Sequence, residues 1–232
     1  MLISKKRQRS VTEVRILEAA VQLFSRQGFS GTGTREIAQL ADVHETTLFR
    51  YYRTKKELFW AALESRLERI RLSRDLQSAL SGDDHPGMTL PRIFEFLVHV
   101  ISEQPELVRL LSVSALELPG SDDVYRTHLG AIFDSVSAYL KRCAAKGAIR
   151  DVDPHIVTLA LVGTVLAHWN MYQIFVDREL PFATPGAATL GYSNFWLNIL
   201  QNGNSVPMRE DGAASLQEPV ISADSEIAPS EL

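Results

Sequence analysis

The sequence of 232 residues predicts an all-α fold. Apolar residues recur at spacings of three and four along much of the chain, as they do on one face of an α-helix. The chain also shows little sustained alternation of apolar and polar residues and few dipeptides typical of β-hairpin turns. Hydrophobic residues make up 45% of the sequence and charged residues 22%, which allows a substantial apolar core.

The first helix is expected to start at Ser10 and to end at Gly28. Ser10 and Glu13 match the S-x-x-E capping box, in which each side chain satisfies a free backbone N–H group of the first turn. Gly28 suits a C-terminal cap because glycine readily adopts the left-handed conformation found there. Apolar residues between the two ends recur on one face of the expected helix.

Three more helices are expected in the N-terminal third of the chain. The second is short, with Thr32 or Thr34 as its N-cap, and a tight break separates it from the third. The fourth is long, with roughly 25 residues and a length of about 37 Å, and a helix of this length often joins two domains. These helices are expected over residues 34–41, 44–52 and 53–80.

The remainder of the chain continues the helical pattern as far as residue 200. Residues 90–102 are apolar almost all round, which predicts a buried helix. Further helices are expected over residues 105–118, 124–146, 154–175 and 187–200. Residues 202–232 have no aromatic residue and carry six acidic residues against one arginine, so this tail is expected to be disordered.

Cysteine content and hydropathy exclude several classes of protein. The single cysteine, Cys143, excludes an internal disulfide framework and a multi-cysteine metal site, and it fits a reducing cytoplasm. The basic N-terminus is not followed by the apolar stretch of a signal peptide. The most apolar run, residues 156–167, is shorter than the roughly 20 residues of a membrane span. We therefore expect a cytoplasmic protein that does not associate with a membrane.

Enzyme signatures are missing from the sequence. The glycine-rich run GTGTRE at residues 31–36 lacks the third glycine of a dinucleotide-binding loop and follows an expected helix instead of a strand. No H-E-x-x-H, G-x-S-x-G or Walker motif is present, and the six histidines are scattered without a close ligand pair. We expect no catalytic residue, metal site or cofactor, although a pocket with converging acid, base and nucleophile would reopen the question.

Charge is distributed unevenly along the chain. Residues 1–56 contain eleven Lys and Arg against five Asp and Glu, a net charge of +6, whereas the rest carries −10. Such an asymmetry suggests that the basic part binds a polyanion. The alternative is a solvated basic arm without a partner.

The second and third expected helices and the turn between them form a helix-turn-helix, whose second helix enters the major groove of DNA. With Leu48 facing inward and about 100° per residue, the outward set comprises Thr46, Thr47, Phe49 and Arg50. Arginine can bond guanine O6 and N7, threonine offers a hydroxyl and a methyl group, and a phenyl ring can contact a thymine methyl. The alternative is an ordinary solvated helical corner.

Residues around this face can contact the phosphate backbone. Arg53, Lys55 and Lys56 lie near the start of the fourth helix, where cations and free amides can meet phosphate. Thr34 can do the same at the start of the second helix. These residues would fix the register of the protein on the duplex.

The run from Gly28 to Leu58, GFSGTGTREIAQLADVHETTLFRYYRTKKEL, resembles the DNA-binding domain of the TetR family of transcriptional regulators. The positions that match the family pattern are Thr32, Arg35, Ile37, Ala38, Ala41, Val43, Thr47, Leu48, Tyr51, Lys55, Glu57 and Leu58. The resemblance covers about 50 residues, and beyond about residue 65 it is one of architecture and length only. The DNA-binding candidates are therefore Thr34, Arg35, Glu45, Thr46, Thr47, Phe49, Arg50, Tyr51, Arg53 and Lys55.

Four positions depart from the usual family pattern. Asp42 stands where glycine is common in the turn, and aspartate tolerates the left-handed conformation better than most residues. His44 replaces a serine-type cap, which predicts a less firmly capped third helix. Glu45 replaces a common lysine and Phe49 a tyrosine. These changes bear on affinity and operator choice.

The resemblance implies a homodimeric repressor with a small DNA-binding domain and a larger helical domain that dimerises and often holds a small molecule. The expected parts are a DNA-binding domain with a basic arm over residues 1–56, a regulatory and dimerisation domain over 57–201, and an acidic tail over 202–232. Members commonly dimerise through their last two helices, here residues 154–175 and 187–200.

Polar residues within apolar helices suggest where a small molecule could bind. Glu95 and His99 are four residues apart and therefore neighbours on one helix face, with Phe96 beside them. Further candidates in apolar helices are His128, His168, Trp169 and Tyr172. A mostly apolar pocket with a few polar groups is the usual form of a ligand site. The alternative is that these are satisfied polar residues of the core.

The sequence thus predicts a dimeric DNA-binding regulator, a repressor that a small apolar or aromatic effector releases from a near-palindromic operator. The alternative is a factor of the same fold that docks a protein partner on DNA and senses no small molecule.

Overall fold

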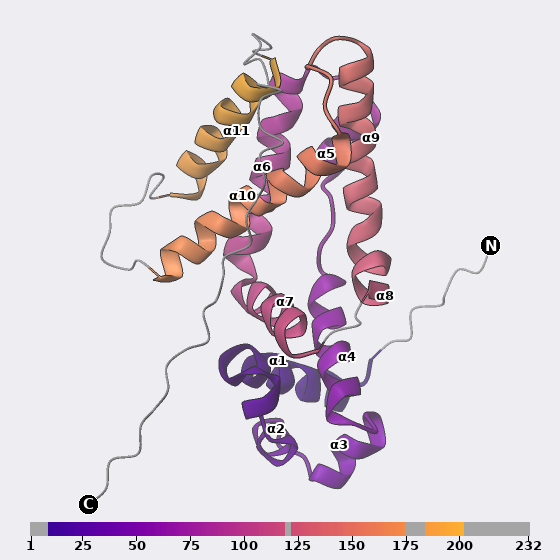
Figure 1. The fold of residues 1–232 in the computed structure, drawn as a ribbon. Helices are drawn as coiled ribbons and strands as arrows, with labels where there is room; N and C mark the ends of the chain where they lie inside the picture. The colour runs from indigo at the N-terminus through magenta and orange to yellow at the C-terminus, as the bar shows by residue number, and fades with distance from the viewer. Residues whose placement is uncertain (1–8, 119–121, 175–183, 202–232) are drawn as a thin grey trace, which may run out of the picture. The chain divides into compact units, whose positions relative to one another are not determined.

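The computed structural model describes residues 9–118, 122–174 and 184–201 (Figure 1). The first elements are α1 (Val11–Gly31), α2 (Thr34–Leu40), α3 (Glu45–Tyr51), α4 (Lys55–Leu67), α5 (Arg74–Ser81) and α6 (Pro86–Glu103). They are followed by α7 (Pro105–Glu117), α8 (Asp122–Tyr125), the π-helical turn η1 (Arg126–Gly130), α9 (Ala131–Ala145), α10 (Pro154–Ile174) and α11 (Pro185–Gln201). These described ranges contain no strand, and the predicted all-α fold is confirmed. Most of the basic arm and all of the acidic tail lie outside them.

The start of α1 is as predicted. The Ser10 hydroxyl accepts a hydrogen bond from the backbone N–H of Glu13 at 3.1 Å and so caps the helix. At Gly28 the backbone leaves the helical conformation with φ of 76°, and one further turn follows before α2. The regular helix therefore ends at the glycine that the sequence indicated, because only glycine adopts this conformation without strain.

The expected cap of α2 is wrong. Gly33 occupies the N-cap position and no side chain caps the helix. The Thr32 hydroxyl donates to the Gly28 carbonyl at 2.7 Å, and the Thr34 hydroxyl donates to Glu45 Oε1 at 2.7 Å. Both threonines are thus used in joining α2 to its neighbours along the chain.

The single long helix expected over residues 53–80 is also wrong, since the chain forms α4 and α5 with a break between them. Each helix has its own cap: the Thr54 hydroxyl accepts from Glu57 N–H at 3.0 Å, and the Ser73 hydroxyl accepts from Leu76 N–H at 3.1 Å. Ile70 in the break is buried. The cap at Ser73 and the burial of Ile70 favour a new helix over continuation of the old one.

The expectation that residues 90–102 are buried all round is wrong for one face of α6. Phe94 and Val98 are buried, whereas Glu95 and His99 are exposed. The two polar residues share a face because they are four apart, and that face points to solvent. The helix expected over 124–146 is interrupted by the π-turn η1, and it ends before Gly147, whose φ is 68°.

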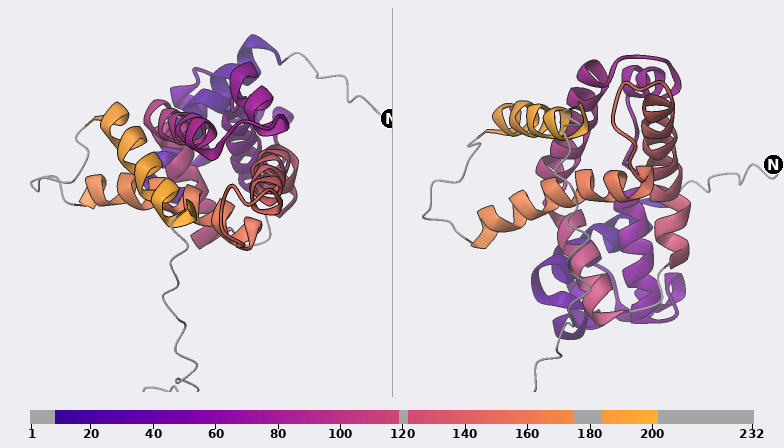
Figure 2. Two further views of the ribbon diagram at one scale, coloured as in Figure 1. Left: turned by 90° about the horizontal axis from the view of Figure 1, so that it is seen from above. Right: turned by 45° about the horizontal axis from the view of Figure 1, so that its top comes forward.

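Two apolar cores organise the described residues. The first is built from α1 to α4 together with Leu107, Leu110 and Leu118 in and after α7. The second is built from α5, α6, α9, α10 and α11 together with Val108 of α7 and with Ile149. Helix α7 packs on α1, α11 runs along α6, and α10 crosses α9 and α6 (Figures 1 and 2). The first core thus includes α7, which lies far along the chain, and the division at residue 56 stays a prediction.

None of the described helices is both long and apolar enough to cross a membrane.

Candidate nucleic-acid interface and ligand cavity

Helix α3 presents the face that its sequence spacing predicts. Leu48 is fully buried in the first core, whereas Thr46, Phe49 and Arg50 are exposed, with 42% of Phe49 accessible to solvent. Thr47 is half-buried beside them. An exposed phenyl ring next to an exposed guanidinium suits contact with base edges.

Hydrogen bonds fix α3 on its neighbours. The Thr34 hydroxyl on α2 bonds the half-buried Glu45 carboxylate, while the Tyr51 hydroxyl lies 3.0 Å from the Ser10 hydroxyl. The Tyr52 hydroxyl donates to Glu13 Oε1 at 3.3 Å, and burial together with the Glu13 carboxylate raises the pKa of Tyr52. Helix α3 is therefore tied to α2 and α1 at both of its ends.

The turn between α2 and α3 is held from α1. Asp42 adopts φ of 52°, the left-handed conformation expected for a residue in the glycine position. The Arg15 guanidinium on α1 donates from Nε to the Ala41 carbonyl at 2.9 Å and also bonds the Asp42 carbonyl and carboxylate. His44 occupies the N-cap of α3 without a side-chain hydrogen bond, as its sequence suggested.

The side chains expected to contact phosphates differ in how far other groups of the protein already engage them. Arg35 and Arg53 are exposed. Lys55 is half-buried: its Nζ lies 4.6 Å from the centre of the Phe29 ring and 3.5 Å from the Ser30 carbonyl. The guanidinium of Arg50 lies 5.8 Å from the centre of the Tyr51 ring. Lys55 thus connects the start of α4 to the end of α1, so it is already partly engaged within the protein.

A contact that the sequence did not indicate joins α7 to the end of α1. The Glu117 carboxylate accepts the backbone N–H groups of Phe29 at 3.1 Å and Ser30 at 2.8 Å. A hydrogen bond with the Ser30 side chain, the backbone hydrogen bonds from Ser30 and Phe29, and the nearby Lys55 charge lower the pKa of Glu117. The partners are 88 and 87 residues apart, so neither spacing nor periodicity could reveal the contact.

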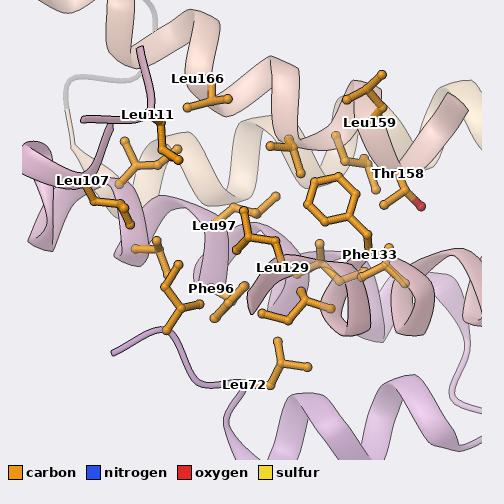
Figure 3. Close-up of a pocket in the computed structure, with 18 of the residues that line it drawn as sticks. Leu72, Phe96, Leu97, Leu107, Leu111, Leu129, Phe133, Thr158, Leu159 and Leu166 are labelled. Carbon is orange, nitrogen blue, oxygen red and sulfur yellow. The ribbon is translucent and has the colours of Figure 1, made fainter. Parts of the chain in front are cut away.

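A cavity of about 300 Å³ lies between the two cores. Its walls come from every helix from α5 to α10, from η1 and from the break between α4 and α5. Among the labelled side chains of Figure 3, only Thr158 carries an oxygen atom, and the others are leucine and phenylalanine. The helices that carry the candidate ligand residues, α6, η1 and α10, all contribute to the wall, and α7 and α9 join them.

The two polar residues of the cavity wall already have partners. The Thr158 hydroxyl bonds the Ser137 hydroxyl at 2.9 Å and donates to the Pro154 carbonyl at 2.7 Å. The Tyr125 hydroxyl bonds the Ser114 hydroxyl. No charged side chain lines the cavity among the residues that the structure describes. The cavity therefore suits an uncharged apolar molecule, because an ionic group would lose its hydration there without compensation.

The described polar residues that the sequence suggested as ligand contacts do not line this cavity. Phe96 does line it, but its neighbours Glu95 and His99 lie on the exposed face of α6. His128 Nε2 lies 3.1 Å from Glu64 Oε1 and so connects η1 to α4.

The remaining candidates lie on α10. His168 packs edge-on against Tyr192, with ring centres 5.4 Å apart, and burial lowers its pKa. Trp169 packs against the second core. The side chain of Tyr172 lies outside the described part of the structure. The expectation missed most of the cavity wall because polar residues were taken as its markers, whereas the wall is almost wholly apolar.

Helices α10 and α11 expose several large apolar side chains. Leu159 is 65% accessible, and the others are Ile156, Met171, Leu190, Phe195 and Ile199.

In the described ranges, no group of three His, Cys, Asp or Glu side chains is placed to hold a metal ion.

Comparison with known proteins agrees with these features. Residues 16–62 match the family described as bacterial regulatory proteins, tetR family. The HTH-type transcriptional regulator RutR of Escherichia coli K12 is 30% identical over 201 residues, which cover 85% of this chain and 90% of RutR. The HTH-type transcriptional repressor KstR of Mycolicibacterium smegmatis is 30% identical over 124 residues, or 53% of this chain and 60% of KstR. The structure of FadR from Bacillus subtilis in complex with stearoyl-CoA superposes with a TM-score of 0.59 at 16% identity, covering 83% of this chain and 99% of FadR.

Proposed function

The chain belongs to the TetR family of bacterial helix-turn-helix transcriptional regulators, and on that premise we propose that it is a dimeric, ligand-responsive repressor. Its relatives include a named repressor, KstR. The observation that carries the proposal is the pairing of an exposed α3 face with an apolar cavity whose wall includes α7, the helix that packs on α1. The protein would act in the cytoplasm and catalyse no reaction.

Helix α3 reads the DNA in this proposal. Arg50 bonds a guanine, Thr46 and Thr47 contact neighbouring bases, and Phe49 rests on a thymine methyl group. Arg35, Arg53 and Lys55 contact phosphates, with Tyr51 as a hydroxyl donor, whereas the Thr34 hydroxyl gives its one hydrogen to Glu45. Glu45 is instead occupied by Thr34, so its part is to orient α3.

The dimer forms through α10 and α11. The apolar residues that these helices expose, among them Leu159, Leu190 and Phe195, are buried in a two-fold interface. A near-palindromic operator follows, because a two-fold dimer presents two α3 helices to half-sites about 34–36 Å apart. Light scattering at micromolar concentration tests the dimer, and a monomer would contradict it.

The effector is an uncharged apolar molecule or the apolar part of a larger one. FadR was solved with stearoyl-CoA, and an acyl chain is the kind of group that a wall of leucine and phenylalanine accommodates. The wall of this cavity offers no charged partner to a carboxylate or phosphate. Any ionic part of the effector would therefore remain outside the cavity.

The proposal is tested with an operator selected from a random duplex pool by the purified protein. A neutral apolar fluorophore, N-phenyl-1-naphthylamine, is titrated into the protein and into the protein–operator complex. The proposal expects the fluorophore to bind in the cavity and to raise the operator Kd. A protein that binds the operator with the same Kd at every fluorophore and apolar-ligand concentration would instead favour a factor that docks a protein partner on DNA.

A further inference from the structure

The inference rests on the proposed function and concerns how ligand binding in the cavity changes the position of α3, the helix proposed to read DNA. Helix α7 contributes Leu107, Val108 and Leu111 to the cavity wall. Its last residue, Glu117, bonds the backbone at the end of α1. Leu111 and Glu117 are six residues apart, a distance of about 9 Å along a helix. A single rigid element therefore links the cavity to α1.

The bond between Glu117 and α1 is a two-point contact. Oε1 accepts the N–H of Phe29 and Oε2 accepts the N–H of Ser30, at 3.1 and 2.8 Å. Charge-assisted bonds of this kind are stronger than neutral ones and fix orientation as well as distance. The carboxylate thus holds two successive backbone N–H groups.

The backbone of α1 is shaped to receive this carboxylate. Gly28 has φ of 76°, and a Cβ atom added there would lie 2.7 Å from Glu117 Oε1. Lys55 at the start of α4 approaches the same segment from its own side, with Nζ 4.6 Å from the Phe29 ring centre. The segment 28–31 is therefore held between α7 and α4 immediately before α2 begins.

We propose that Glu117 is the positioning residue through which occupation of the cavity alters the placement of α2 and α3. A molecule that fills the cavity presses on the side chains of α7, and the helix carries that displacement to its last residue. The two bonds to Phe29 and Ser30 then shift the segment that precedes α2, or break and release it. Either change alters the position of α3 relative to the DNA, so ligand and operator become linked.

A second polar contact also connects the cavity wall to the N-terminal helices, and it offers an alternative route by which a ligand could affect α3. His128 on η1 bonds Glu64 on α4 at 3.1 Å, and the adjacent Leu129 lines the cavity. This contact joins two side chains, whereas Glu117 holds the main chain itself. Glu64→Ala therefore serves as the variant that breaks this second contact, because alanine offers neither a donor nor an acceptor to His128.

The experiment compares Glu117→Gln with Glu106→Gln, a matched change in the first turn of the same helix. Glutamine offers one acceptor oxygen, so Glu117→Gln keeps at most one of the two bonds and loses the charge. Without any ligand, Glu117→Gln is expected to raise the Kd for the selected operator about fivefold. Random-sequence DNA should bind as before, and Glu106→Gln should stay within about twofold of wild type. Equal operator affinity for the two variants would overturn the positioning role.

The coupling is measured by adding N-phenyl-1-naphthylamine. In Glu117→Gln the fluorophore should change the operator Kd by less than about twofold, although it binds the DNA-free variant as tightly as it binds wild type. Two results would overturn the proposal. One is a fluorophore effect in Glu117→Gln as large as in wild type. The other is an effect that persists in Glu117→Gln and disappears in Glu64→Ala. If the fluorophore leaves the wild-type operator affinity unchanged, the proposed ligand response fails, and the operator Kd of Glu117→Gln alone decides the positioning role.

Discussion

The two apolar cores of this chain differ in how completely side chains fill them. In the first, Phe24, Phe59 and Leu48 are fully buried, and the Phe24 and Phe59 rings meet edge-on with centres 5.1 Å apart. The second borders a cavity of about 300 Å³, which reaches the first core only at its edge, at Ile70 and Leu107. A filled core fixes the geometry of α3, because close-packed side chains allow few alternative arrangements. A core with an open space instead leaves room for a ligand to change the packing.

Truncating one leucine in each core is the strongest test of whether the two cores are packed differently. Leu48→Ala removes a fully buried side chain of the first core and is expected to cost about 2–5 kcal/mol of unfolding free energy. Leu97→Ala, in the half-buried cavity wall beside the second core, should cost less than half as much because one side of Leu97 already lacks neighbours. Urea unfolding of both variants measures the difference. Equal losses would show that the two regions are packed alike.

Operator reading should depend on the exposed face of α3 and be insensitive to the cavity wall. Arg50→Ala is expected to lose about 1–3 kcal/mol of operator binding and to relax specificity at one base pair in each half-site. Fluorescence anisotropy with the operator and with single-base variants measures both effects. If Arg50→Ala weakened operator and random DNA by the same factor, Arg50 would contact phosphate instead of a base.

Phosphate contacts should affect all DNA sequences alike. Arg53→Ala, at an exposed position, is expected to lower the slope of log Kd against log salt by about one. Lys55→Ala should also weaken all sequences, but by a smaller change in slope, since Lys55 is partly engaged by Phe29 and Ser30. Titrations at several salt concentrations test the order. A larger slope change for Lys55→Ala would indicate that it leaves Phe29 when DNA binds.

The smallest expected effect concerns pH and the second core. Burial lowers the pKa of His168 below its ordinary value of about 6.5, so the folded protein favours the neutral ring. Its contribution to stability is complete above about pH 6.5 and is lost as pH falls towards the lowered folded-state pKa. Urea midpoints at pH 7.5 and 5.5 should differ less in His168→Gln than in wild type. The same substitution at the exposed His99 provides the control, and an unchanged pH dependence in His168→Gln would contradict the prediction.

The helix-turn-helix was the part of the molecule whose structure could be predicted most fully from the sequence. The inward Leu48 and the outward Thr46 and Arg50 follow from helical spacing alone, and the Ser10 cap follows from one short pattern. These features are local, so neighbouring residues determine them. The left-handed Asp42 likewise follows from its place in the turn.

Features that depend on distant contacts were not predictable in the same way. The break before α5 depends on where Ile70 is buried, and the contact of Glu117 with Phe29 joins segments 88 residues apart. Glu95 and His99 looked like polar residues within a buried helix, but which face of α6 is covered depends on the packing of α10 and α11. The cavity is invisible to a search for polar markers because its wall is almost wholly apolar.

The central claim is that the cavity and the DNA-reading face are thermodynamically linked. The most direct test titrates N-phenyl-1-naphthylamine into wild-type protein alone and into protein saturated with operator, and measures the operator Kd with and without saturating fluorophore. Linkage requires both measurements to give one factor, since the ligand must weaken the operator as much as the operator weakens the ligand. We predict a shared factor of about five or more. A fluorophore that binds free and operator-bound protein equally would contradict the account.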